Sequence, residues 1–187
     1  MLFRSAYLLP TQDIDIVVSY GDDPEWIKRA IVDADDRYFL EPSKKRREKY
    51  KKLYCRLPGF HAYDRCIKVD ILVPPSELGL PDVDSFETPV INDIPVMPLF
   101  ELLVMKTQGW QHHRTSERED FRAKVNADVT DIDALLDCAI QEDVWYQDEI
   151  DSNRLPSEFM DWALTLARMF ARRHGRWRKW KAIGFPL

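Results

Sequence analysis

The chain has little of what a secreted or membrane-embedded protein needs. Its three cysteines, Cys55, Cys66 and Cys138, form no Cys-x-x-Cys pair. Neither a disulfide framework nor a paired-cysteine metal site is therefore indicated. No apolar run approaches the roughly 20 residues that span a bilayer, and no signal peptide is recognisable. These absences predict reduced, buried thiols, no membrane partner, and a cytoplasmic or nuclear location.

An excess of positive charge is also missing. The formal net charge is -5, so any attraction for polyanions such as nucleic acids must come from local basic patches. Hydrophobic residues, in contrast, make up 45% of the 187 residues. That content supports a substantial core and argues against disorder. The composition predicts one globular domain, or a small α/β domain with a helical extension.

The most informative motif is the pair of aspartates in TQDIDIVV, residues 11–18. Asp13 and Asp15 begin an apolar, β-branched strand, so both side chains point to one face while Ile14 turns toward the packing. Two such carboxylates repel each other unless a cation neutralises them, and a hard divalent ion such as Mg²⁺ does so well. The alternative is a solvated strand end without a ligand.

A second acidic strand follows in KVDILV, residues 68–73, which Pro74 and Pro75 end. Burying an unpaired carboxylate is costly, so Asp70 must be paired, protonated, metal-bound or at an open edge. If this strand lies beside the first, three carboxylates converge on one point. That arrangement suits two divalent ions about 4 Å apart, as in a reaction centre.

Together these motifs resemble the nucleotidyltransferase superfamily to which DNA polymerase beta and the small bacterial nucleotidyltransferase toxins belong. The likeness is greatest to the toxin-like members and covers about residues 7–140. Beyond the acidic triad, it includes a leucine-rich segment from Pro98 to Lys106, Arg114, a charged turn at 117–120 and an Asp-rich segment at 128–133.

The resemblance implies an α/β (α+β) fold with a small mixed sheet flanked by helices. Residues 1–97 would form this core, and residues 98–187 a helical segment packed on it with a basic aromatic tail. It also implies transfer of a nucleoside monophosphate from a nucleoside triphosphate such as ATP to an acceptor hydroxyl, with Mg²⁺ or Mn²⁺ as cofactor. The acceptor could be RNA, protein or a small molecule.

Residue roles carry over by position from the same resemblance. Asp13 and Asp15 would hold both metal ions, while Asp70 would hold the catalytic ion and help to deprotonate the acceptor hydroxyl. Two ions can stabilise the attacking and leaving oxygens of an in-line displacement at the α-phosphate. The predicted nucleotide-binding residues are Ser5, Thr11 and Lys106. Lys106 has an alternative interpretation, as a solvated lysine ending an amphipathic helix.

One part of the family pattern is missing. Family members carry a Gly-Gly or Gly-Ser pair before the Asp-x-Asp strand, where small residues let the backbone approach phosphates closely. Here no glycine precedes Gly21, and Arg4-Ser5 is the nearest counterpart. Either the chain is truncated at its start or this phosphate-binding element has been lost.

Two alternatives to catalysis by a nucleotidyltransferase follow. Without the phosphate-binding glycine pair, the chain would be a degenerate nucleotidyltransferase-fold protein that binds a nucleotide or a partner without turnover. The Asp-x-Asp pair could also be the metal motif of a nucleotide-sugar glycosyltransferase. That interpretation leaves Asp70 unexplained and lacks the larger nucleotide-binding region of such enzymes.

Two basic segments allow two interpretations each. The run at residues 43–56 interleaves lysines and arginines with tyrosines, which suits phosphate or RNA contact but also a solvated strand edge. The tail RWRKWK, residues 176–181, suits phosphate contact and base stacking. It suits docking equally well, with Trp177 and Trp180 packed on the body and the cations outward.

Capping signals predict four helices. Asp22–Glu25 supplies a capping carboxylate and a proline for the first helix. Pro98 predicts the start of the second helix, and Thr130 is expected to be the N-cap of the third. The fourth is predicted over Pro156–His174, with Gly175 ending it.

Overall fold

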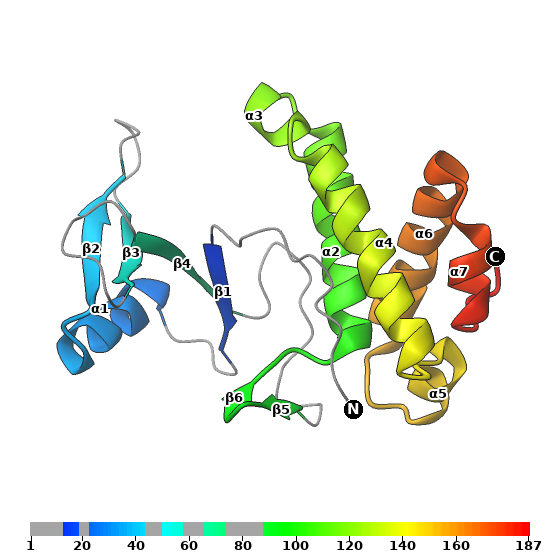
Figure 1. Cartoon of the computed structure of the whole chain (residues 1–187), viewed down its shortest axis with the longest axis horizontal. Coiled ribbons are helices and arrows are strands. Elements are labelled where there is room, and N and C mark those ends of the chain that lie inside the picture. The colour runs from blue at the N-terminus through cyan, green and yellow to red at the C-terminus, as the bar shows by residue number, and fades with distance from the viewer. Residues whose placement is uncertain (1–12, 19–22, 44–49, 58–65, 74–87) are drawn as a thin grey trace. The chain divides into compact units, whose positions relative to one another are not determined.

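The computed structural model describes residues 13–18, 23–43, 50–57, 66–73 and 88–187. The chain divides into two compact units, residues 1–77 and 78–187. Helices and strands are both present, so the mixed α and β fold class expected from the sequence is confirmed (Figure 1). The predicted nucleotide-binding residues Ser5 and Thr11 lie outside the described residues, as does the lysine- and arginine-rich stretch 44–49.

The first unit is built on a four-stranded mixed sheet (Figure 1). Its spatial order is β1-β4-β3-β2, with β1 and β4 parallel and the other neighbours antiparallel. The two acidic strands predicted from the sequence are therefore immediate neighbours. The strands are β1 (Asp13–Val17), β2 (Tyr38–Pro42), β3 (Lys51–Arg56) and β4 (Cys66–Leu72).

Helix α1 (Pro24–Ala34) connects β1 to β2 in the sequence. The Asp23 carboxylate accepts a hydrogen bond of 3.0 Å from the Glu25 amide, and Pro24 occupies the first turn. These are the start signals expected from the sequence, so this prediction is confirmed. Ile27 and Ile31 on α1 pack against the sheet. The helix therefore covers one face of it.

Strand alternation gives the sheet an apolar face and a polar one. On the apolar face Leu53, Val69 and Ile71 are buried at the centre. Neighbouring apolar residues on the strands also pack there: Ile16, Val18, Tyr38, Leu40 and Cys55. The intervening side chains point to the opposite side. We call this side the polar face, and it carries Asp13, Asp15, Phe39, Lys52, Tyr54, Arg56, Lys68 and Asp70.

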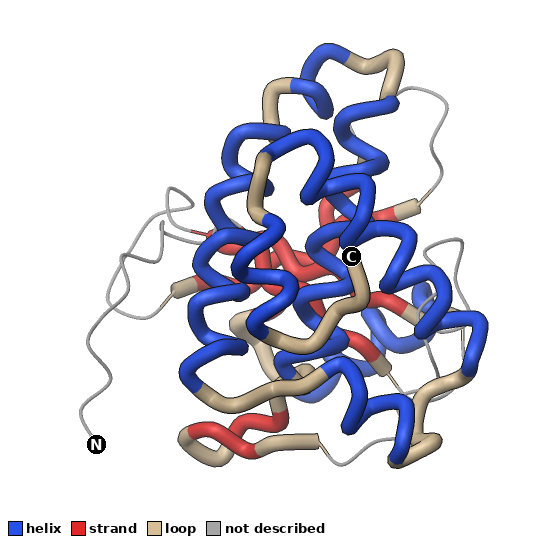
Figure 2. Tube along the Cα trace, turned by 90° about the vertical axis from the view of Figure 1, so that its right-hand side faces the viewer, coloured by secondary structure: helices blue, strands red, loops and turns tan. Residues whose placement is uncertain are grey.

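The second unit consists of a short hairpin followed by helices (Figures 1 and 2). Strands β5 (Val90–Ile91) and β6 (Ile94–Pro95) are joined by a turn at Asn92 and Asp93. Both turn residues have positive φ, as a type I′ hairpin turn requires. The helices are α2 (Leu99–Thr115), α3 (Glu119–Arg122), α4 (Val125–Gln141), α5 (Tyr146–Asp151), α6 (Ser157–His174) and α7 (Trp177–Ala182).

A large aromatic core holds these helices together. Trp110 on α2 meets Phe170 on α6 edge to face, with ring centroids 5.0 Å apart. Phe170 in turn contacts Trp180 on α7 at 6.2 Å. All three side chains are at most 1% exposed. The long helices α2, α4 and α6 pack side by side around this core (Figures 1 and 2).

Two predicted helix ends are wrong. Lys106 does not end its helix, because α2 continues to Thr115. Thr130 is not an N-cap, because α4 already begins at Val125. Its hydroxyl donates instead to the Asn126 carbonyl at 3.1 Å. A threonine within a helix can satisfy its hydroxyl in this way, which the capping interpretation overlooked.

The C-terminal predictions are confirmed. Helix α6 ends at Gly175, which has a left-handed φ of 67° and donates its amide to the Ala171 carbonyl at 2.8 Å. Trp180 is 1% exposed and Trp177 packs against the same core. The basic tail therefore docks as α7. None of the helices within the described ranges is both long and apolar enough to cross a bilayer.

Candidate cation site on the polar face of the sheet

The pairing of β1 with β4 brings the three predicted carboxylates onto one face. Asp15 lies directly opposite Asp70, and Asp13 lies opposite Lys68. Neighbouring strands are about 4.8 Å apart, so the three acids occupy adjacent positions on two strands. All three point away from the buried Val69 on the other face of β4. The register thus places the candidate site on the polar face.

Lys68 is the cation of this cluster. Its Nζ forms an ion pair with Asp70 Oδ2. Burial by itself would lower the pKa of Lys68, but the hydrogen bond and charge of Asp70 and the charges of Asp13 and Asp15 outweigh it. The pKa of Lys68 is therefore raised. All three carboxylates act on this one ammonium group.

The donor set can be compared with what a metal ion needs. Three carboxylates are the hard oxygen ligands that Mg²⁺ and Mn²⁺ prefer, and the Lys68 ammonium stands in as the positive charge among them. In the part of the chain that the structure describes, however, no three His, Cys, Asp or Glu side chains are gathered closely enough to hold an ion. The residue types fit a metal, whereas the side-chain positions match a bound lysine.

An aromatic pair continues the same row of the sheet. Tyr54 on β3 lies opposite Lys68, and Phe39 on β2 lies opposite Tyr54. Their rings stack with centroids 5.7 Å apart and planes 22° from parallel. Across the polar face the row therefore runs from Asp13 through Lys68 to Tyr54 and Phe39.

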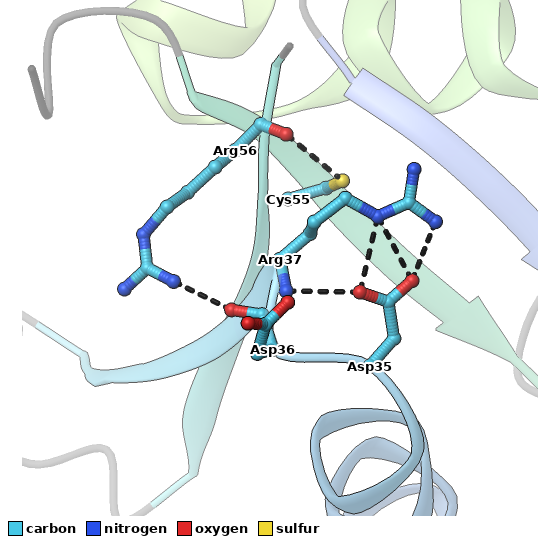
Figure 3. Close-up of polar contacts among 5 residues, drawn as sticks. All are labelled: Asp35, Asp36, Arg37, Cys55 and Arg56. Carbon is cyan, nitrogen blue, oxygen red and sulfur yellow. Dashed lines mark hydrogen bonds and ion pairs between the residues drawn. The ribbon is translucent and has the colours of Figure 1, made fainter. Parts of the chain in front are cut away.

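Arg56 adds a cation to this pair. Its guanidinium carbon lies 4.6 Å from the Phe39 ring centroid, within cation–π range. One guanidinium nitrogen, Nη1, donates to the Asp36 carbonyl at 2.6 Å, which anchors the side chain (Figure 3). The nearby Arg37 is neutralised by Asp35, with ion-pair contacts of 2.9 and 2.5 Å (Figure 3). The hydrogen bonds from Arg37 lower the pKa of the Asp35 carboxyl.

The predicted nucleotide-binding lysine belongs to the other unit. Lys106 lies within α2 and forms an ion pair of 2.9 Å with Asp131 on α4. The two side chains are 44% and 38% exposed. A helix–helix ion pair at a partly exposed position explains this lysine without a nucleotide, and its role in nucleotide binding stays a prediction.

Sequence reasoning assigned no role to Lys68, Phe39, Tyr54 or Arg56 individually. The spacing of Lys68 two residues before Asp70 was the available signal, because such residues share a strand face. The aromatic pair depends on the register between β2 and β3, which no local motif specifies. Comparison of the chain with protein-family models, curated proteins and solved structures gives no match.

Proposed function

We propose that this protein is a metal-dependent nucleotidyltransferase, which moves a nucleoside monophosphate from a nucleoside triphosphate to an acceptor hydroxyl. The observation that carries the proposal is the register of the two acidic strands. Asp15 lies opposite Asp70, with Asp13 on the same face. Carboxylates are the ligand type that Mg²⁺ and Mn²⁺ prefer, so these three residues supply suitable donors on one face of the strand pair.

In this proposal each carboxylate has a defined task. Asp13 and Asp15 would hold both ions, and Asp70 would hold one and accept the proton of the acceptor hydroxyl. The bound ions would supply the positive charge that offsets the triphosphate. The acceptor oxygen forms a bond to the α-phosphorus, the bond from the α-phosphorus to the bridging oxygen breaks, and pyrophosphate leaves.

Lys68 must change partner for this chemistry. Its ammonium now pairs with Asp70, on the carboxylate that would have to bind an ion. The long, flexible lysine stem allows the ammonium to swing to a phosphate oxygen without moving the strand. Lys68 would thus neutralise the acidic cluster before binding and the triphosphate after it.

The second candidate function is nucleotide or partner binding without turnover. It is favoured by the Lys68–Asp70 ion pair, which already satisfies one carboxylate of the set. A chain that keeps this pair permanently would have no strong need for a metal ion. The two candidates therefore differ in whether divalent ions displace the lysine.

Pyrophosphate release tests the catalytic proposal directly. The full chain is incubated with each nucleoside triphosphate, Mg²⁺ or Mn²⁺, and a panel of RNA, protein and small-molecule acceptors. We expect release that Asp13→Ala abolishes and that Asp33→Asn leaves intact, because Asp33 is an exposed acid on α1. Retained activity in the Asp13→Ala variant would contradict the proposal. Nucleotide binding without any release would support the second candidate.

A further inference from the structure

In the part of the first unit that the structure describes, the stacked rings of Phe39 and Tyr54 lie outside the apolar core of the sheet. Their strand neighbours Tyr38 and Cys55 pack on the apolar face beneath α1, whereas the two rings stand on the polar face. Both are only partly buried. Within the described part of this unit α1 is the only helix, and it packs on the opposite face. The rings thus form an aromatic surface among charged side chains.

The distance of this surface from the acidic cluster is set by strand spacing. Tyr54 is two strands away from Asp13 in the same row. At about 4.8 Å between strands, the two backbones are about 10 Å apart. The ribose of a nucleotide spans only part of this distance, and the ions that would lie between the carboxylates and the α-phosphate in the proposed function would span the rest. A nucleotide whose α-phosphate lies at the acidic cluster can therefore place its base over Tyr54.

The chemistry of the surface matches a base. Aromatic rings provide stacking planes for the π-face of any nucleobase, and an arginine beside them contributes a cation–π interaction. Arg56 is held in that position by its bond to the Asp36 carbonyl and its contact with Phe39 (Figure 3). A cross-strand aromatic pair also stabilises a sheet by itself. The experiment must therefore separate binding from folding.

We propose that the Phe39–Tyr54 pair, with Arg56, is the site for the nucleobase of the nucleoside triphosphate. This inference rests on the proposed function for the position of the phosphates, and it adds what holds the base. Purines should bind more tightly than pyrimidines, because their larger rings cover more of the aromatic surface. Because stacking tolerates different bases, discrimination between adenine and guanine should be weak.

Calorimetric titration of the full chain with ATP and with tripolyphosphate tests the proposal, since tripolyphosphate has no base. We expect Tyr54→Leu to weaken ATP binding by about tenfold or more. Binding of tripolyphosphate should not change. Tyr54→Phe keeps the ring and should restore ATP binding. Trp26→Leu is the matched control, because Trp26 is an aromatic side chain of α1 that is 60% exposed.

The outcomes separate this inference from the proposed function. If Tyr54→Leu weakens ATP binding while no pyrophosphate is ever released, the base site stands and catalysis does not. Unchanged ATP binding in a folded Tyr54→Leu variant would overturn the base site, even if the wild type is active. Loss of binding to single-stranded RNA with unchanged ATP binding would also overturn it, because the surface would then serve the acceptor.

Photolabelling tests the base site in the wild-type protein, so its result does not depend on whether the Tyr54→Leu variant folds. Irradiation with 8-azido-ATP should label the tryptic peptide Leu53–Arg56, which contains Tyr54, or the peptide Tyr38–Lys44, which contains Phe39. Excess ATP should suppress that label, and tripolyphosphate should suppress it less effectively. A label confined to other peptides would contradict the assignment of the base site.

Discussion

The two units of this protein use charge and apolar surface in opposite ways. In the helical unit, large aromatic side chains are buried together and the charged residues pair with one another across helices. Among the described residues of the sheet unit, only Leu53, Val69 and Ile71 are buried, and the carboxylates of Asp13, Asp15 and Asp70 all act to raise the pKa of Lys68. The difference indicates that the helical core contributes much of the stability, whereas the charges on the sheet are the ones to which our proposal assigns a ligand.

The largest expected effect is loss of stability from the helical core. Phe170 is fully buried and contacts both Trp110 and Trp180. Phe170→Ala should lower the free energy of unfolding by about 3–5 kcal/mol, because it removes buried area and leaves a cavity. Urea unfolding monitored by tryptophan fluorescence measures this loss. A cost below about 1 kcal/mol would contradict the assignment of stability to this core.

Glu101 on α2 sharpens the contrast between the two units, because it is an ionisable group that is fully buried in the helical unit. Its side chain is 0% exposed, and Oε1 lies 2.8 Å from Arg154 Nη1. Neither carboxylate oxygen has a well-aligned hydrogen bond to a described residue. Burial raises the pKa of Glu101 more strongly than the charge of Arg154 lowers it.

The sign of the resulting pH dependence follows from linkage. A raised pKa means that the folded chain holds this proton more tightly than the unfolded chain, whose value is near 4.5. The stability from this group is complete below that value and is lost as pH rises through the raised pKa. The slope can reach about 1.4 kcal/mol per pH unit. Urea unfolding between pH 4 and pH 8 should show it in the wild type and not in Glu101→Gln, and equal slopes would refute it.

Lys68→Met should break the balance of charge in the sheet unit. The variant loses the ion pair with Asp70 and the attraction of this ammonium to Asp13 and Asp15, so folding should weaken by about 1 kcal/mol at neutral pH. Affinity for Mn²⁺ should rise several-fold, since the ion no longer displaces a lysine. Titration followed by Mn²⁺ electron paramagnetic resonance measures the affinity. Weaker Mn²⁺ binding in this variant would show that Lys68 does not compete for the site.

The smallest effect is expected for Lys106→Met, the matched control in the helical unit. The Lys106–Asp131 pair is partly exposed, and such pairs stabilise a protein by about 0.2–1 kcal/mol. Thermal unfolding should therefore change little, and Mn²⁺ affinity should not change at all. A large loss of nucleotide binding in this variant would instead favour the role that the family resemblance implies for Lys106.

The sequence predicts those parts of the fold that depend on contacts between residues near one another in the chain. The alternation in β1 and β4 and the Asp23–Pro24 helix start can be recognised without knowing the rest of the fold. The end of α2 could not be predicted in this way. Thr107 follows Lys106 and is fully buried, with its hydroxyl donating to the Leu103 carbonyl at 2.7 Å. A polar residue that appears to end the helix is thus satisfied inside it.

The candidate site shows the same limit. The sequence supplies Asp13, Asp15 and Asp70, but their position on one face depends on β1 lying beside β4, which the sequence left as a condition. The role of Lys68 depends further on which carboxylate its ammonium reaches. Tyr54 and Phe39 meet only because β3 and β2 pair in one particular register. Side chains on different strands meet only when the strands pair in a given register, so these contacts cannot be predicted from local sequence patterns.

Binding of Mn²⁺ to the full chain tests the central claim most directly, because catalysis and base recognition both depend on the acidic cluster being a cation site. We expect the wild type to bind Mn²⁺, and Asp15→Asn and Asp70→Asn each to weaken that binding by at least about tenfold. Asp33→Asn should bind like the wild type. Equal Mn²⁺ affinity in all four proteins, or no binding by the wild type, would contradict the account.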